Sequence, residues 1–175
     1  MKKLFLILVS AFVAFGALGQ EAKPKIAVYT SKVAEVPTLG PLTSQIIKSF
    51  LADYEVVGRA GEFQQLIDKE FDYQSSGKVD DKQLAERGRQ FGVDYICAVV
   101  VHKFSQSYYF EARIISVENA NVVGIADVDT NNELSPSELM EIGRKLVADL
   151  AEEVQAYDAQ QEKPSIAVYT NTLSG

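Results

Sequence analysis

Two kinds of apolar pattern alternate along this chain of 175 residues. Short runs rich in Val, Ile and Tyr are typical of strands, whereas apolar residues that recur every three or four positions are typical of helices. The runs predict strands at residues 25–30, 54–57, 94–104, 108–115 and 122–128, and the periodic segments 42–51, 63–67, 84–91 and 139–154 predict helices. The order β-α-β-α-α-β-β-β-α predicts an α/β (α+β mixed) fold, in which a mixed β-sheet of about five strands is flanked by helices.

Polar residues and glycines mark the ends of the central elements. Asp80 and Asp81 precede the third helical segment, where a carboxylate caps free N–H groups and favours the positive end of the helix. Gly92 follows the same segment and fits the left-handed residue that often closes a helix. The continuous apolar run 95–101 predicts a strand that is buried on both faces.

The first residues have the pattern of an export signal. Two lysines precede the apolar run 4–15, and the small residues after it predict cleavage before Gln20. A transmembrane anchor is the alternative, but the run is shorter than the ~20 residues that span a bilayer. No cysteine follows the run to carry a lipid. We therefore expect residues 1–19 to be a signal peptide. The mature chain would be exported, without a membrane span, and periplasmic or outer-membrane-associated rather than lipid-anchored through its own N-terminus.

An internal repeat indicates a tandem protein. The string KPKIAVYT at residues 23–30 recurs as KPSIAVYT at residues 163–170, with one residue changed. We interpret residues 23–154 as one domain, 155–162 as a linker, and 163–175 as the start of a second, truncated copy. The alternative is that the second string forms an extra strand of a single domain.

Composition narrows the range of partners. The formal net charge is -7, and an acidic surface repels phosphate backbones, so nucleic acid is not an expected partner. Cys97 is the single cysteine of the sequence and lies within an apolar strand, which predicts a buried, reduced thiol with a structural role.

The sequence provides no catalytic set. His102 is the one histidine and is expected to be an exposed or hydrogen-bonded strand residue, and no serine stands in a nucleophile-elbow context. A phosphate loop and a dinucleotide fingerprint are both missing from the sequence, and one histidine with one cysteine disfavours zinc. We therefore predict no enzyme, and no catalytic, cofactor-binding or metal residues. A hydrolase with a carboxylate-only site is the weaker alternative.

A calcium-binding module is the main alternative function. Residues 127–138 match the spacing of an EF-hand loop, with oxygen side chains at positions 1, 3, 5, 9 and 12, the last being Glu138. Two features oppose the EF-hand interpretation. Asn132 stands where a glycine is usual, and the segment before the loop has the pattern of a strand rather than of a helix. The competing interpretation is a polar loop in which Ser135 or Ser137 caps the last helix.

An ordered set of residues resembles the CsgG-like group of bacterial envelope proteins, which overlaps in fold with the TolB amino-terminal domain and with lipoprotein activators of penicillin-binding proteins. The matching positions are Gln74, Ser76, Gly77, Val79, Asp80, Asp81, Gly88, Gly92, Val93, Asp94 and Tyr95, followed by the ARII strand at 112–115 and Val117-Glu118. The chain departs from the group at Asn119, where a glycine is usual. It also lacks the lipid-modified cysteine that the group often carries.

The resemblance implies a non-catalytic envelope domain that binds other proteins. Its partners would be other envelope proteins, or the chain itself through a tandem domain. The membrane-spanning hairpins of the curli secretion channel have no counterpart in the sequence, so pore formation is not implied. Tyr109, Glu111 and Arg113 share one strand face, which is either a partner surface or a solvated face with cross-strand pairs.

Overall fold

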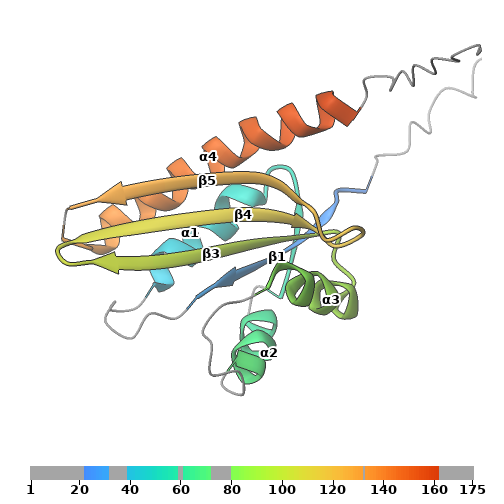
Figure 1. Ribbon diagram of the computed structural model, residues 1–175, viewed down its shortest axis with the longest axis horizontal. Helices are drawn as coiled ribbons and strands as arrows, with labels where there is room; N and C mark the ends of the chain where they lie inside the picture. Colours follow the sequence, from blue (N-terminus) through green and yellow to red (C-terminus); the bar gives the residue numbers. More distant parts are fainter. Residues whose placement is uncertain (1–21, 32–38, 59–60, 72–79, 132, 162–175) are drawn as a thin grey trace, which may run out of the picture.

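The helices and strands follow the predicted order. The computed structural model describes residues 22–31, 39–58, 61–71, 80–131 and 133–161. Within these ranges the elements are β1 (Lys25–Thr30), α1 (Gly40–Phe50), β2 (Glu55–Val57), α2 (Glu62–Phe71), α3 (Asp81–Phe91), β3 (Tyr95–Phe104), β4 (Ser107–Ser116), β5 (Val122–Thr130) and α4 (Pro136–Gln161). The five described strands form one mixed sheet on which four helices pack, and this confirms the predicted fold class (Figure 1).

The sheet changes from parallel to antiparallel pairing across its width. Its strand order is β2-β1-β3-β4-β5, and β1 runs parallel to both β2 and β3. β3, β4 and β5 form an antiparallel meander. β2 pairs with β1 only from Lys25 to Ala27, so in the described part of the chain no strand borders Thr30 on that side.

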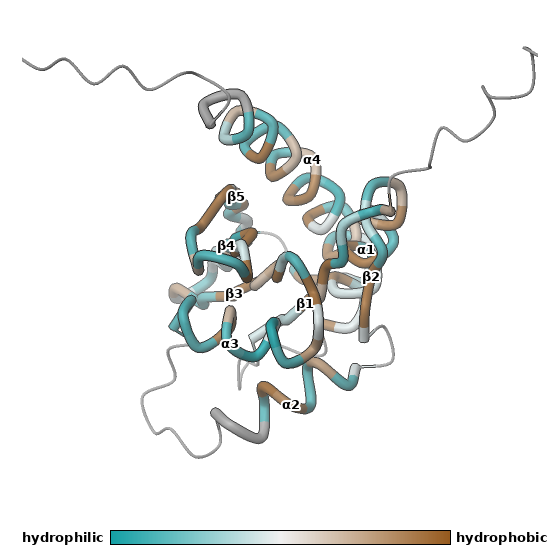
Figure 2. The backbone as a smooth tube through the Cα atoms, turned by 90° about the vertical axis from the view of Figure 1, so that its right-hand side faces the viewer, coloured by the Kyte–Doolittle hydropathy of each residue, from teal (hydrophilic) through white to brown (hydrophobic). Residues whose placement is uncertain are grey.

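Helices cover the two faces of the sheet unequally. α1 and α4 lie on one face, and α4 packs along β5, whereas α2 and α3 lie on the other face near β1 and the start of β3 (Figure 1, Figure 2). The larger core, under α1 and α4, includes Ile26, Leu42, Ile46, Cys97, Val99, Phe110, Ile114, Leu146 and Leu150. The smaller core, under α2 and α3, includes Ala27, Phe63, Ile67, Leu84, Ile96 and Ile115. β3 is therefore buried on both faces at its beginning, as its continuous apolar run predicts.

The ends of α3 confirm the predicted caps. The Asp80 carboxylate accepts a hydrogen bond from the backbone N–H of Lys82 at 3.1 Å. Gly92 adopts a left-handed conformation with φ of 67°, and its N–H donates to the carbonyl oxygen of Arg89 at 3.2 Å. These contacts pair helix-end groups that would otherwise lack a partner.

The last helix is longer than its apolar pattern indicates. α4 continues to Gln161, so residues 155–161, which the sequence analysis assigned to a linker, are helical. The signal peptide, residues 1–19, and the second copy, residues 163–175, lie outside the described residues, so the domain boundaries stay predictions. None of the helices in the described ranges is long and apolar enough to cross a membrane.

Candidate functional site

Half of one sheet face extends beyond the cover of α2 and α3. Alternate residues of a strand point to one face, so the register of β3, β4 and β5 defines the side chains that share it. We call this surface the open face, and it comprises Val100, His102, Phe104, Tyr109, Glu111, Arg113, Ile125, Asp127 and Asp129. Ile125 is 53% exposed and Phe104 is 59% exposed. Apolar side chains are therefore accessible here, although the opposite side of the same strands is buried.

Three rings gather at one end of the open face. His102 lies opposite Tyr109 in the ladder, and their ring centroids are 6.1 Å apart. The His102 and Phe104 rings are stacked, also with centroids 6.1 Å apart. Aromatic rings at such separations attract one another and form a continuous contact surface. His102 is an exposed strand residue, as the sequence predicts.

The open face has one guanidinium, and its ion pairs are imperfectly aligned. An Nη atom of Arg113 lies 3.2 Å from a carboxylate oxygen of Asp81, and its Nε lies 3.4 Å from a carboxylate oxygen of Glu111. Neither Arg113 Nε nor Asp81 Oδ1 makes a hydrogen bond to any of the described residues, and both atoms are buried. Buried polar atoms without a hydrogen bond are stabilised when a binding partner supplies the missing bond.

Carboxylates outnumber the guanidinium on this surface. Asp127 pairs with Glu111 in the β4–β5 ladder, and Asp129 pairs with Tyr109. Partial desolvation, and after it the charges of Asp127, Glu111 and Asp129, raise the pKa of Tyr109. The sequence correctly placed Tyr109, Glu111 and Arg113 on one face, and the strand register adds the two aspartates to it. The open face is thus acidic as well as aromatic.

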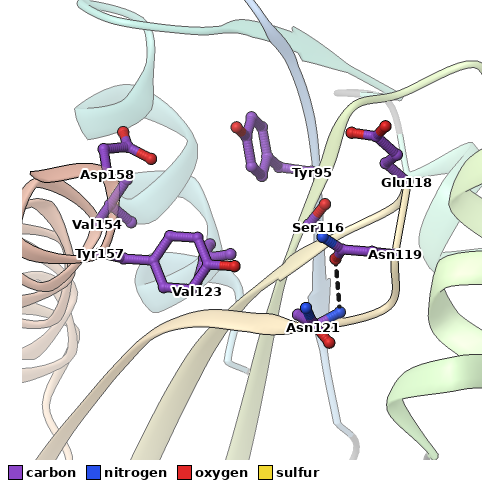
Figure 3. A pocket seen from close by; sticks show the side chains of 9 residues that line it. All are labelled: Tyr95, Ser116, Glu118, Asn119, Asn121, Val123, Val154, Tyr157 and Asp158. Atoms are coloured by element: carbon purple, nitrogen blue, oxygen red, sulfur yellow. Dashed lines mark hydrogen bonds between the residues drawn. The ribbon is translucent and has the colours of Figure 1, made fainter. Parts of the chain in front are cut away.

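A pocket of about 340 Å³ lies at the other end of the sheet, between α4 and the β4–β5 turn (Figure 3). It is lined by Tyr95, Ser116, Glu118, Asn119, Asn121, Val123, Val154, Tyr157 and Asp158. The Asn119 side chain accepts a hydrogen bond from the backbone N–H of Asn121 at 2.9 Å, which fixes the turn that forms one wall. The predicted strands 108–115 and 122–128 place a connection here, but the sequence pattern gave no sign of the pocket.

The pocket does not have the arrangement of a hydrolytic site. Glu118 and Asp158 come from opposite walls, the β4–β5 turn and α4 (Figure 3). Ser116 is the serine among the lining residues. Its hydroxyl forms no hydrogen bond to a basic side chain within the described residues. Nucleophilic catalysis requires such a base within hydrogen-bond reach. These groups can hold a ligand, but they form no nucleophile–base pair.

The proposed calcium loop has a different geometry from an EF-hand. Asp127, Asp129 and Thr130 belong to the extended strand β5, whereas an EF-hand loop follows a helix and curls around the ion. Ser135 Oγ accepts a hydrogen bond from the backbone N–H of Glu138 at 3.2 Å, as expected if Ser135 caps α4. Within the described ranges, which omit Asn132, no three His, Cys, Asp or Glu side chains are grouped so that they could hold a metal ion.

Comparisons with known proteins give structural neighbours only. No family model and no curated protein matches the chain. Lipoprotein GNA1162 from Neisseria meningitidis is 17% identical with a TM-score of 0.46, covering 74% of this chain and 99% of that one. The LpoB C-terminal domain from Escherichia coli is 10% identical with a TM-score of 0.46, covering 66% and 88%. TolB from Acinetobacter baumannii is 9% identical with a TM-score of 0.46, covering 77% and 29%. At these scores and identities the neighbours assign neither a family nor a function to the chain.

Proposed function

We propose that this chain is an exported, non-catalytic module of the bacterial cell envelope that binds a protein partner through its open face. The observation that carries the proposal is the surface itself, where exposed Ile125 and Phe104 lie among carboxylates on a sheet buried on its other side. Accessible apolar side chains rimmed by polar groups are typical of interaction sites. The export signal predicted at residues 1–19 and the resemblance to CsgG-like envelope proteins support the location.

The charges of the open face indicate the chemistry of the partner. Glu111, Asp127 and Asp129 outnumber Arg113, which is itself paired with two carboxylates. A complementary surface would present lysine or arginine side chains around an aliphatic or aromatic residue that contacts Ile125. The expected partner is therefore an envelope protein with a basic patch.

A second copy of this domain is less suited to the same surface. Two open faces placed against each other would bring Asp127 and Asp129 of both copies together, and like charges at close range oppose association. A full second copy, of which residues 163–175 would be the start, would thus use another surface, such as the outer edge of β5.

Site-specific photo-crosslinking in the native bacterium tests the proposal. A photoreactive residue replaces Ile125 in one strain and Met140, which is 37% exposed on α4, in a control strain. We expect one dominant crosslinked protein from position 125 and little from position 140. Fractionation of the same cells locates the chain, and we expect it in the periplasmic or outer-membrane fraction.

Binding measurements with the crosslinked protein then decide the mechanism. We expect Asp127→Asn and Asp129→Asn to weaken binding, and added salt to weaken the wild-type complex, because the contact is electrostatic in part. Glu141→Gln on α4 is the control, since Glu141 is an exposed carboxylate that pairs with Arg144 of the same helix and is not part of the open face. Crosslinks that are equal at both positions, or a control variant that weakens binding as much, would contradict the proposal.

A further inference from the structure

Two tyrosines line the pocket at the end of the sheet, and a third, Tyr54 in the turn between α1 and β2, packs behind one of them. Tyr95 begins β3 and Tyr157 lies near the end of α4, and both line the cavity (Figure 3). The Tyr95 ring meets the Tyr54 ring edge to face, with centroids 6.0 Å apart, and Tyr54 meets Phe50 in the same manner at 5.4 Å. This chain of ring contacts ties Tyr95 to the larger core and holds one aromatic wall of the pocket in place.

The pocket has a negative electrostatic environment. Burial raises the pKa of Tyr95, and the charges of Asp158, Asp94 and Glu118 raise it further. Burial also raises the pKa of Tyr54, with Asp158 among the anionic groups that add to the effect. Burial has the largest effect on both pKa values, and the carboxylates near the rings add to it because they disfavour a second negative charge. The same carboxylates favour a cation placed between them.

A hydroxyl without a hydrogen bond lies in the wall of this pocket. Ser116 is only 9% exposed, and its backbone N–H and carbonyl are bonded to Asn121 and Ala120 in the turn. The residue lines the cavity (Figure 3), and its side-chain hydroxyl has no hydrogen-bond partner within the described residues. The hydroxyl is open to the cavity, so it can donate to or accept from a polar group placed there.

We propose that this pocket binds an organic ammonium group carried on a short alkyl chain. The faces of Tyr95 and Tyr157 attract a cation through their π electrons, and Asp158 and Glu118 supply opposite charge. The Ser116 hydroxyl accepts one ammonium N–H, and Val123 and Val154 contact the alkyl chain. The volume of about 340 Å³ is near the lower end of ligand pockets and suits one small cationic head.

The ammonium group has two possible sources, a free diamine or the lysine side chain of a peptide. The pocket lies at the opposite end of the sheet from the rings of the open face, so ligand binding here is separable from partner binding there. Cadaverine represents the first source, Nα-acetyl-lysine amide represents the second, and the uncharged pentanediol is the control for both. Whichever amine binds more tightly identifies the source.

Titrations followed by NMR chemical shifts test the site. We expect saturable shifts at Ser116, Asn119 and Asn121 with either amine and none with pentanediol. Asp158→Asn should weaken amine binding about three- to tenfold, as should Tyr157→Leu, because each removes one of the attractive contacts. Both residues lie near the end of α4, so unchanged melting temperatures will show that the variants remain folded.

Glu152→Gln provides the matched control. Glu152 is exposed on α4 and is not part of the pocket lining, so this variant makes the same change of charge without removing a contact. We expect it to alter amine affinity by less than about twofold. Equal weakening by Glu152→Gln and Asp158→Asn, or equal shifts with pentanediol, would overturn the proposal.

Discussion

The side-chain amide of Gln64 pairs with both backbone groups of Thr30. Gln64 Oε1 accepts the Thr30 N–H at 2.9 Å, and Gln64 Nε2 donates to the Thr30 carbonyl oxygen at 2.9 Å. The same Nε2 also donates to the Asp68 carboxylate at 2.9 Å, which orients the amide. Because β2 ends before it reaches Thr30, Gln64 takes the place that a peptide group of a longer strand would occupy.

We predict that Gln64→Ala lowers the free energy of unfolding by about 1–3 kcal/mol, since two backbone groups of Thr30, a residue only 6% exposed, lose their partners. Gln65→Ala on the exposed side of α2 should change it by no more than about 0.5 kcal/mol. Urea denaturation measures both variants. Equal stabilities would mean that water replaces Gln64 without loss.

The approach of α3 to the sheet depends on Gly88. A Cβ atom at this position would lie 2.6 Å from Val117 Cγ2 and 2.7 Å from Ile96 Cδ1, both far inside normal contact. We predict that Gly88→Ala destabilises the fold by about 1–3 kcal/mol, although alanine favours helices. Gly143→Ala should destabilise less, because its Cβ would come no closer than 3.2 Å to Leu42. Thermal melting of the two variants gives the comparison, and a reversed order would contradict the packing argument.

The sequence predicts the elements of this fold better than it predicts its contacts. Apolar periodicity and the caps at Asp80 and Gly92 depend on neighbouring residues, so they can be read from a local pattern. The repeat that begins at residue 163 led to the interpretation of residues 155–162 as a linker, yet alanine and glutamine favour helices and α4 continues through residue 161.

The candidate sites depend on contacts between distant parts of the chain. Tyr95 has the pattern of an ordinary strand residue, and only the packing of α4 against the sheet brings Tyr157 to the same pocket. Similarly, Asp127 belongs to the open face because of its register with Glu111 in β4. No local signal in the sequence specifies which helix end packs against which turn. The contact between Gln64 and Thr30 likewise depends on packing between distant segments, α2 and β1.

The geometry of residues 127–138 leads to a prediction about calcium. We expect millimolar calcium to leave the melting temperature unchanged, because Asp127 and Asp129 are held in the ladder of β5 rather than in a curled loop. Calorimetric titration of the protein, with magnesium as the control ion, measures this. A calcium-specific rise in melting temperature that Glu138→Gln abolishes would restore the EF-hand interpretation.

The thiol of Cys97 should be unreactive in the folded protein. Cys97 is fully buried between the two helical layers, and burial raises its pKa from 9.0 to about 12. The thiolate is the reactive form, so we predict negligible alkylation at neutral pH until denaturant unfolds the chain. Mass spectrometry after a pulse of iodoacetamide measures the modified fraction. Rapid alkylation without denaturant would show that the core opens locally at β3.

Cys97 and Tyr29 together predict a loss of stability in alkali. Burial, and after it the charge of Asp68, raises the pKa of Tyr29 from 10.0 to about 12. Above about pH 9 the unfolded chain releases these two protons while the folded chain keeps them, so the free energy of unfolding is full below that pH and falls as the pH rises toward 12. Each group contributes a slope of up to about 1.4 kcal/mol per pH unit.

Urea denaturation between about pH 8 and pH 11 measures this slope. We expect Cys97→Ala and Tyr29→Phe each to flatten it, whatever their effect on stability at neutral pH. A slope that neither variant changes would assign the alkaline loss to other groups.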